Sequence, residues 1–403
     1  MHIINLQNFI NKHVIKRCYS LFEADIQMNE ALLTTKIQGK SVLVIGGAGT
    51  IGSSYIKAIL KFKPSKLVVV DSNENGLTEL TRDLRSTLGQ YLPNDYTTYP
   101  MNFGDPVFTK MFHAHKGFQI VANFAAHKHV RSEKDQFSVE AMIDNNVMRA
   151  KELLDLLLQN KPDNFFCVST DKAANPVNVM GASKKLMEEV VMAYSQDLHI
   201  TTARFANVAF SNGSLLDGYI QRLFKNQPIS CPNDVKRFFV SPEESGQICM
   251  LACMLGSSGD IFFPKLGPDK MVDFKEITYA FFKEIGRDLL ECNSEDEAKA
   301  NTMQLDDVTP YPVFFFPSNT SGEKLFEEFY TTDDYLDTAS YNALGVIKNA
   351  KCLSLQEVNF CLTEIKKVLS KSNFLKEDVV FIMKKYLPSF QHLETGKTLD
   401  SKM

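Results

Sequence analysis

The sequence predicts an α/β fold: a doubly wound parallel sheet with a smaller C-terminal lobe and helical N- and C-terminal extensions. Two observations predict it. From Ser41 onward, short continuous apolar runs alternate with longer amphipathic stretches. Continuous Val/Ile runs are typical of strands buried on both faces, as in parallel sheets. After Phe210 the rhythm changes to shorter elements punctuated by Gly and Pro, which indicates a second lobe.

Composition narrows the class of protein. The chain has 403 residues, of which 44% are hydrophobic and 23% charged, as in globular proteins. Its net charge of −4 is spread evenly, so we expect no nucleic-acid partner. No apolar stretch reaches the roughly 18 residues that a membrane span needs, and the N-terminus lacks a signal-peptide core. We therefore expect a cytoplasmic protein without a membrane span.

The eight cysteines are scattered and lack the spacing of metal ligands, which favours reduced thiols and no metal site. Cys249 and Cys253 stand one helical turn apart in the run ICMLACML, which predicts a helix that faces the core.

Each element follows in chain order. Residues 1–38 have loosely helical apolar spacing and predict a helical arm, either a lid or dimer arm or a helix that docks on apolar surface. Residues 39–210 predict the first domain, 211–350 the second lobe and 351–403 a C-terminal helical extension. The six strands expected in the first domain are SVLVI (41–45), KLVVVD (66–71), YTTYPM (96–101), QIVANFA (119–125), NFFCVS (164–169) and ITTARF (200–205).

A glycine loop follows the first strand and precedes a helix, the order that a bound pyrophosphate requires. Gly46 permits a tight turn, Gly49 lets the backbone approach phosphates, and Gly52 allows close helix packing. Thr50 and Ile51 begin the helix, whose free N–H groups face the anion. The loop and the strand rhythm together predict a Rossmann-type dinucleotide-binding domain.

Asp71 closes the second strand, where a carboxylate accepts hydrogen bonds from the adenosine ribose hydroxyls. The first basic residue after it is Arg82, so a ribose 2′-phosphate would lack a counter-ion, which favours NAD over NADP. Asp105, after the third strand, is a candidate for the adenine edge, or it caps the next helix.

The fifth strand is followed by the segment STDKAANPVNVMGASKK (169–185). An open α/β sheet places ligand chemistry at the carboxyl ends of its strands. Asp171 and Lys172 stand there as neighbouring acid and base, each able to shift the pKa of the other. The alternative interpretation is a surface ion pair.

This segment resembles the extended short-chain dehydrogenases/reductases, in which a strand-end Ser/Thr is followed by YxxxK on a helix. Lys184 holds the Lys position, and Met180 replaces the usual tyrosine. Another YxxxK, at residues 279–283, lies beyond the first domain and predicts an ordinary amphipathic helix.

The combination STDKAxNPxNVMGAxK resembles the UDP-N-acetylglucosamine 4,6-dehydratases of polysaccharide biosynthesis, specifically the subgroup with Met in place of Tyr. Further segments agree, among them AAHKHV (125–130), RFANV (204–208), SGEKLFEE (321–328) and HLETGK (392–397). Two features depart from the family: the transmembrane helices of its long members are absent, and His127 replaces a leucine.

The resemblance implies catalytic roles. Asp171 is the acid for the departing C6 hydroxyl, Lys172 the base at C5, and Thr170 assists at C4. Lys184 would bind the nicotinamide ribose. Met180 would shape the pocket floor, or it is an ordinary core methionine.

The resemblance also implies binding residues. In addition to the glycine loop, Ala125 and Ala126 would contact NAD. The residues expected to bind a nucleotide sugar, or alternatively to form structural ion pairs and hydrogen bonds, are Lys128, His129, Asn207, Arg237, Glu323 and Lys324.

Three functions follow from these observations. The first is a dehydratase that acts on UDP-N-acetylglucosamine with internally recycled NAD and retained C5 configuration. The second is a UDP-sugar 4-epimerase, although the family's epimerases use the missing tyrosine. The third is a non-catalytic NAD- or nucleotide-sugar-binding regulator, which would leave Asp171 and Lys172 without a task. By resemblance, we also expect a homo-oligomer.

Overall fold

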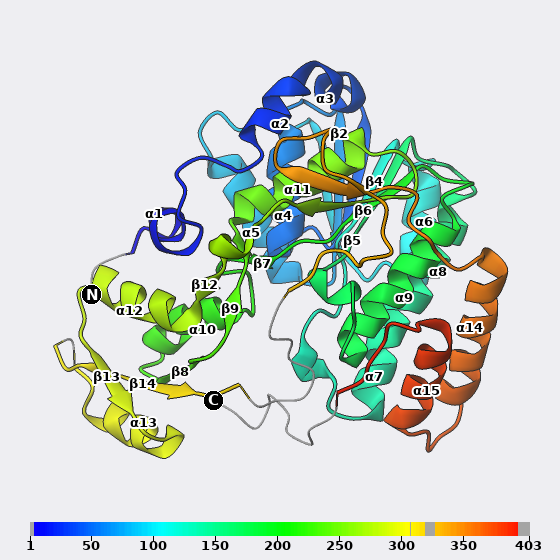
Figure 1. Ribbon diagram of the computed structural model, residues 1–403. Coiled ribbons are helices and arrows are strands. Elements are labelled where there is room, and N and C mark those ends of the chain that lie inside the picture. The colour runs from blue at the N-terminus through cyan, green and yellow to red at the C-terminus, as the bar shows by residue number, and fades with distance from the viewer. Residues whose placement is uncertain (1–3, 307, 319–326, 394–403) are drawn as a thin grey trace.

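A large parallel sheet lies at the centre of the computed structural model, which describes residues 4–306, 308–318 and 327–393 (Figure 1). Within these ranges its nine strands have the order β15-β16-β11-β6-β5-β4-β1-β2-β3. β16 runs antiparallel to β11 and β15, and every other neighbouring pair is parallel. The strands are β1 (Ser41–Ile45), β2 (Lys66–Asp71), β3 (Asp95–Pro100), β4 (Ile120–Asn123), β5 (Asn164–Val168), β6 (Ile200–Ala203), β11 (Asp260–Pro264), β15 (Leu336–Asp337) and β16 (Leu344–Ile347).

Helices cover both faces of this sheet. Alternate residues of β1 point to opposite faces: Val42 and Val44 pack with one helical layer, Leu43 and Ile45 with the other. The first layer contains α3 (Glu30–Ile37), α4 (Thr50–Leu60), α5 (Glu74–Ser86) and α11 (Pro242–Leu255). The second contains α6 (Pro106–Ala114), α7 (Gln136–Ile143), α8 (Arg149–Leu157) and α9 (Val179–Ala193). The predicted doubly wound fold and its six strands are therefore confirmed.

The helix predicted from ICMLACML is α11, and Cys249 and Cys253 are buried in it. α11 crosses α4 closely because Gly246 has no side chain. A Cβ at this position would lie 2.2 Å from the carbonyl oxygen of Ser54. All eight cysteines are free thiols.

The expected boundary at residue 210 is corrected by the structure. Residues 211–350 do not form one separate lobe, because α11, β11, β15 and β16 return to the first domain. Every residue of the runs DIFFP (260–264) and LGVI (344–347) is buried in the large sheet. Burial of this apolar surface favours their place in the sheet over a place in the small lobe.

The remaining part of this region forms the second lobe around its own apolar core. The predicted amphipathic helix over 279–283 belongs to α12, where Tyr279 is exposed while Phe281 and Phe282 are buried. The lobe contains α10 (Leu215–Phe224), α12 (Phe274–Glu284), α13 (Glu295–Asn301) and a parallel sheet of β13 (Leu289–Cys292), β14 (Tyr311–Phe316) and β8 (Ile229–Pro232). Short ladders join β9 (Lys236–Arg237) to β12 (Val272–Asp273) and β7 (Asn207–Val208) to β10 (Phe239–Val240).

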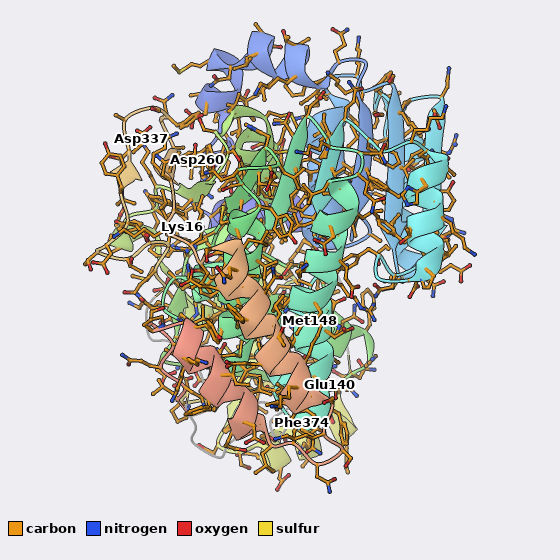
Figure 2. All side chains as sticks on the ribbon, turned by 90° about the vertical axis from the view of Figure 1, so that its right-hand side faces the viewer. Lys16, Glu140, Met148, Asp260, Asp337 and Phe374 are labelled. Atoms are coloured by element: carbon orange, nitrogen blue, oxygen red, sulfur yellow. The ribbon has the colours of Figure 1, made fainter. Side chains whose placement is uncertain are left out.

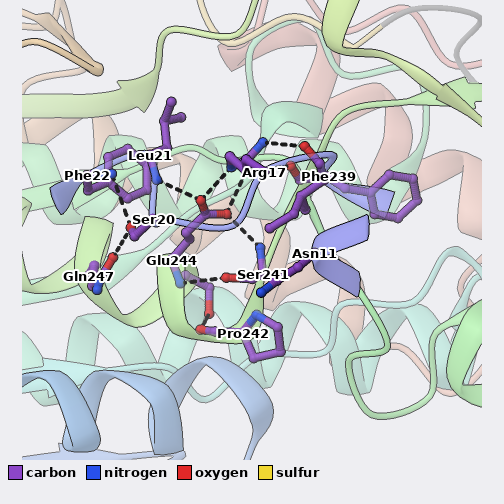
Figure 3. A network of polar contacts seen from close by, with 12 residues as sticks. Asn11, Arg17, Ser20, Leu21, Phe22, Phe239, Ser241, Pro242, Glu244 and Gln247 are labelled. Carbon is purple, nitrogen blue, oxygen red and sulfur yellow. Dashed lines mark hydrogen bonds and ion pairs between the residues drawn. The ribbon is translucent and has the colours of Figure 1, made fainter. Parts of the chain in front are cut away.

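The N-terminal arm is helical and docks on both units. Phe9 packs edge-on against Phe281 of the second lobe at 5.7 Å between ring centroids, while Phe22 is buried in the first domain. Between them, Arg17 forms an ion pair with the buried carboxylate of Glu244, at 2.6 Å (Figure 3). The helices are α1 (Leu6–Phe9), a π-helical turn (Ile10–Val14), α2 (Glu23–Met28) and α3. The arm thus covers apolar surface, as one interpretation expected; a role as a lid or dimer arm stays a prediction.

Two C-terminal helices, α14 (Leu355–Leu369) and α15 (Lys376–Tyr386), pack on α9 (Figure 2). Beyond them the backbone N–H of Gln391 donates to the carbonyl of Pro176, and that of Leu393 to Val177. Residues 391–393 therefore reach the loop that follows β5.

The expected homo-oligomer stays a prediction. No helix in the described ranges is long and apolar enough to cross a membrane.

Candidate active site

The glycine loop between β1 and α4 closes tightly on its neighbours. Gly46 has a left-handed φ of +74°, and a Cβ there would lie 2.5 Å from the amide nitrogen of Ala125. A Cβ on Gly52 would lie 2.3 Å from the carbonyl oxygen of Gly46. Both positions therefore require glycine, which brings the start of α4 against the end of β4.

A cavity of about 250 Å³, here named the glycine-loop cavity, opens at this point. α4 begins after Gly49, which has no side chain to cap the helix, so the first N–H groups are available to an anion. The carboxylate of Asp71 accepts hydrogen bonds from the amides of Ala48 and Asn73, at 3.0 and 2.9 Å. The lining includes the predicted residues Gly46, Gly49, Thr50, Ile51, Gly52, Asp71, Ala125 and Ala126. This arrangement fits the pyrophosphate and adenosine ribose of a dinucleotide.

Asn146 fixes the backbone of His127, which lines the glycine-loop cavity. Its side chain accepts from the amide of His127 at 2.8 Å and donates to the carbonyl of the same residue at 3.0 Å. Burial lowers the pKa of His127, and the nearby Arg149 adds to this effect. Both effects favour the neutral imidazole at this position.

Asp105 stands at the N-cap position of α6, but its side chain makes no capping hydrogen bond to that helix; its carboxylate accepts instead from the amide of Asn102 at 3.0 Å. Asn102 itself lines the glycine-loop cavity. Asp105 therefore shapes the turn beneath the cavity; its contact with an adenine edge stays a prediction.

A larger cavity of about 680 Å³ lies where the first domain faces the second lobe, and we name it the interlobe cavity. Lys128 lines both cavities and donates to the carbonyl of Asn212 at 3.1 Å. The amide of Asn212 donates in turn to Thr50 at 3.0 Å. Burial lowers the pKa of Lys128. The glycine-loop cavity and the interlobe cavity thus meet at the side chain of Lys128.

The Asp171–Lys172 pair lies at the carboxyl end of β5. Lys172 Nζ lies 3.1 Å from each carboxylate oxygen of Asp171, and Thr170 donates to Asp171 at 2.6 Å. Lys172 lines the interlobe cavity, whereas Asp171 is only 3% exposed behind it. Burial lowers the pKa of Lys172, but the carboxylates of Asp171 and Glu327 outweigh it and raise the pKa overall. The structure thus brings an acid and a base together at one wall.

Met180 and Lys184 lie deeper than the resemblance implied. Met180 is 2% exposed and packs in the core between the sheet and α9. Lys184 Nζ donates to the carbonyl of Val168 at 2.7 Å, and burial lowers its pKa. In the described parts of the chain, neither side chain is among those that line the two cavities. Their catalytic roles stay predictions.

Three more of the expected substrate residues lie at the same cavity. His129, Asn207 and Arg237 line the interlobe cavity together with Lys172. Glu323 and Lys324 lie outside the described residues. The cavity also contains two basic residues of α10 that the sequence did not single out, Arg222 and Lys225.

Sequence reasoning also missed Glu327. Its side chain is 2% exposed, and its carboxylate accepts from Asn207 at 2.5 Å and from the amide of Phe238 at 2.9 Å. Arg237 Nε lies 3.6 Å away. Burial and the charge of Asp171 raise the pKa of Glu327 to about 7, although Lys172 and Arg237 oppose them. Its position within the SGEKLFEE segment was the available signal.

Among the residues that the structure describes, no three His, Cys, Asp or Glu side chains are grouped as metal ligands would be. The chemistry of the site is that of amines, carboxyls and a glycine loop.

Comparisons with known proteins agree with this geometry. Over 353 residues the chain is 28% identical to an uncharacterized membrane protein of Methanocaldococcus jannaschii, with 83% of this chain and 97% of that protein covered. It is 26% identical over 244 residues to an inverting UDP-N-acetylglucosamine 4,6-dehydratase of Campylobacter jejuni, with 58% and 70% covered. Two longer bacterial relatives are covered over 42% of their length.

A solved structure has the same fold. It is DesIV, a dTDP-glucose 4,6-dehydratase from Streptomyces venezuelae with bound NAD, which matches with a TM-score of 0.52 and 19% identity over 62% of this chain and 82% of that chain. The family model for polysaccharide biosynthesis proteins matches residues 42–349, most of the chain. This protein therefore belongs to the polysaccharide biosynthesis protein family.

Proposed function

We propose that this chain is an NAD-dependent nucleotide-sugar 4,6-dehydratase that converts UDP-N-acetylglucosamine to a 4-keto-6-deoxy sugar. The observation that carries the proposal is the Asp171–Lys172 pair, 3.1 Å apart, on the wall of a cavity that meets the glycine-loop cavity. Similarity to the Campylobacter jejuni enzyme supports the choice of sugar.

The glycine-loop cavity supports NAD as the cofactor. The N-terminus of α4 would hold the pyrophosphate, and Asp71 would accept from the ribose hydroxyls and disfavour a 2′-phosphate. When bound, NAD supplies the chemistry of taking a hydride from C4 of the sugar and returning it to C6.

The protein's own groups would move the protons. The 4-ketone acidifies the C5–H bond, and Lys172, in its neutral form, removes that proton. Asp171, in its protonated form, donates to the C6 hydroxyl, which leaves as water. The C4 hydroxyl proton would pass through Thr170, which lies 2.6 Å from the Asp171 carboxylate, to Asp171, and it is the proton that Asp171 then gives to the C6 hydroxyl. Lys172 would return its proton to C5 as the hydride returns to C6.

The charge of the interlobe cavity suits a diphosphate. Four cationic side chains line it in addition to Lys172: Lys128, Arg222, Lys225 and Arg237. Arginine forks match phosphate oxygens, and the volume of about 680 Å³ is in the range of ligand sites. The second lobe would therefore bind the nucleotide diphosphate and direct the sugar toward Lys172.

Mass spectrometry tests the proposal. The holoenzyme is incubated with UDP-N-acetylglucosamine, and the expected product has lost one water. An isomer of unchanged mass would indicate a 4-epimerase instead, and an unchanged substrate would indicate a binding protein. Proton NMR of the product then shows whether the C5 configuration is retained, as the resemblance implies.

The epimerase is the weaker alternative. In the described chain the position of the family's tyrosine holds Met180, which cannot exchange a proton and lies in the core. A regulatory binder would not need the acid and base that the interlobe cavity brings together.

A further inference from the structure

The Glu327 carboxylate is built into the active site without a role in the scheme above. It lies behind the wall of the interlobe cavity, and its two closest side-chain partners, Asn207 and Arg237, both line that cavity. A buried carboxylate is costly unless hydrogen bonds and cations compensate it. A carboxylate buried at this place therefore calls for an explanation beyond packing.

The segment that carries Glu327 is fixed to the first domain. Arg204, at the end of β6, donates to the carbonyl of Phe329 at 3.0 Å. The Phe329 ring lies 6.3 Å from Phe263 in a stacked arrangement and 5.8 Å from Phe238. Glu327 is thus held by rigid neighbours, and its carboxylate has a defined direction.

The charged groups that act on Glu327 in the described chain are Asp171, Lys172 and Arg237. Two carboxyls and two cations therefore share one desolvated cluster. Lys172 stands among them and is influenced by both carboxylates. Loss of the negative charge of either carboxylate would lower the pKa of Lys172.

We propose that Glu327 is a positioning residue of the reaction: it holds Asn207 and Arg237 against the cavity, and its charge sets how readily Asp171 and Lys172 exchange protons. This inference rests on the proposed dehydratase function. Burial and Asp171 raise the pKa of Glu327 to about 7, so its charge changes near neutral pH. A neutral Glu327 would favour the neutral Lys172 that takes the C5 proton.

The test begins with Glu327→Gln in the NAD-loaded enzyme. Glutamine keeps the shape and one acceptor but removes the negative charge. Without that charge the pKa of Lys172 falls, so the optimum of the dehydration rate should move to lower pH by about one unit. Glu327→Asp keeps the charge and should restore the wild-type optimum at a reduced rate.

Glu328→Gln is the matched control. It removes the same kind of charge from the adjacent exposed residue while glutamine keeps an oxygen that can accept from Asn175, the present partner at 3.0 Å, so its pH profile should superimpose on the wild type. If the Glu327→Gln profile also superimposes and only the overall rate or stability changes, Glu327 is merely structural and the proposal is wrong.

An infrared measurement separates this proposal from the dehydratase proposal, because it needs no turnover. As the pH of the NAD-loaded protein falls from about 8 to about 6, a protonated-carboxyl band should appear, be absent in Glu327→Gln and persist in Glu328→Gln. Lys172→Met should move the band to higher pH. If wild-type enzyme removes no water but the band behaves in this way, only the assigned reaction fails. If Lys172→Met leaves the band unmoved, the coupling is refuted.

Discussion

Arg204 donates two hydrogen bonds to the carboxylate of Glu188, at 2.8 and 2.7 Å, and both side chains are buried. Ser169, the first residue of the segment 169–185, donates to the same carboxylate at 2.5 Å. This ion pair therefore ties α9, the ends of β5 and β6, and the segment of Phe329 into one unit.

The first prediction concerns acid stability. Burial raises the pKa of Glu188, but Arg204 outweighs burial and the pKa is held at about 2, below its ordinary value of 4.5. The stabilisation is thus complete above about pH 4.5 and is lost as the pH falls toward 2, with a loss on the order of 3 kcal/mol.

Urea unfolding at a series of pH values checks this prediction. Glu188→Gln should be less stable near neutral pH, because Arg204 loses its counter-charge, and its stability should depend less on pH across the same window. An equal slope in both proteins would contradict the assignment.

The second prediction concerns the arm. Arg17→Met would leave the carboxylate of Glu244, 0% exposed, without its cation and should cost about 3 kcal/mol of unfolding free energy. Lys12 lies on the same arm and forms an exposed ion pair with Glu284 of α12. Lys12→Met, which breaks this pair, should cost less than about 1 kcal/mol. Similar losses in the two variants would show that the arm is not anchored by Arg17.

The third prediction concerns cofactor choice. The Asp71 carboxylate faces the glycine-loop cavity, so Asp71→Asn should weaken NAD binding about tenfold. The same change should reduce the preference for NAD over NADP. Calorimetric titration with both cofactors measures this. Asp105→Asn tests the adenine contact: such a contact predicts weaker NAD binding, whereas a role confined to the turn at Asn102 predicts lower stability with unchanged affinity.

The fourth prediction concerns chemistry. Asp171→Asn should reduce dehydration about a thousandfold, because the C6 hydroxyl loses its proton donor, while NAD stays bound. Product formation by mass spectrometry and NAD content by absorbance are measured on the same sample. Wild-type turnover in this variant would refute the role of Asp171.

The sequence was sufficient for the first six strands. SVLVI, KLVVVD, QIVANFA and NFFCVS are largely apolar runs, and the alternation of strands with amphipathic helices located YTTYPM and ITTARF. It was insufficient for β11 and β16, since β11 pairs with β6 and β16 with β11, both far away in the chain; β15 joins the sheet only through the nearby β16. Long-range pairing depends on total burial, which no local pattern records.

The site shows the same division. The glycine loop, Asp71 and the Asp171–Lys172 pair carry local signals, and the structure brings them to two adjoining cavities. Glu327 carries only a weak signal, its place in the SGEKLFEE segment, because a glutamate in a charged segment is ordinarily solvated. Its burial arises only when Asn207, Arg237 and the Phe238 amide surround it.

The bonds from Gln391 and Leu393 to Pro176 and Val177 have a consequence for biosynthesis. The loop that carries Asp171 and Lys172 is translated long before the residues that brace it. A nascent chain can therefore complete its sheet while this loop still lacks two of its backbone partners. Catalytic competence would then be acquired late, when the residues beyond α15 have left the ribosome.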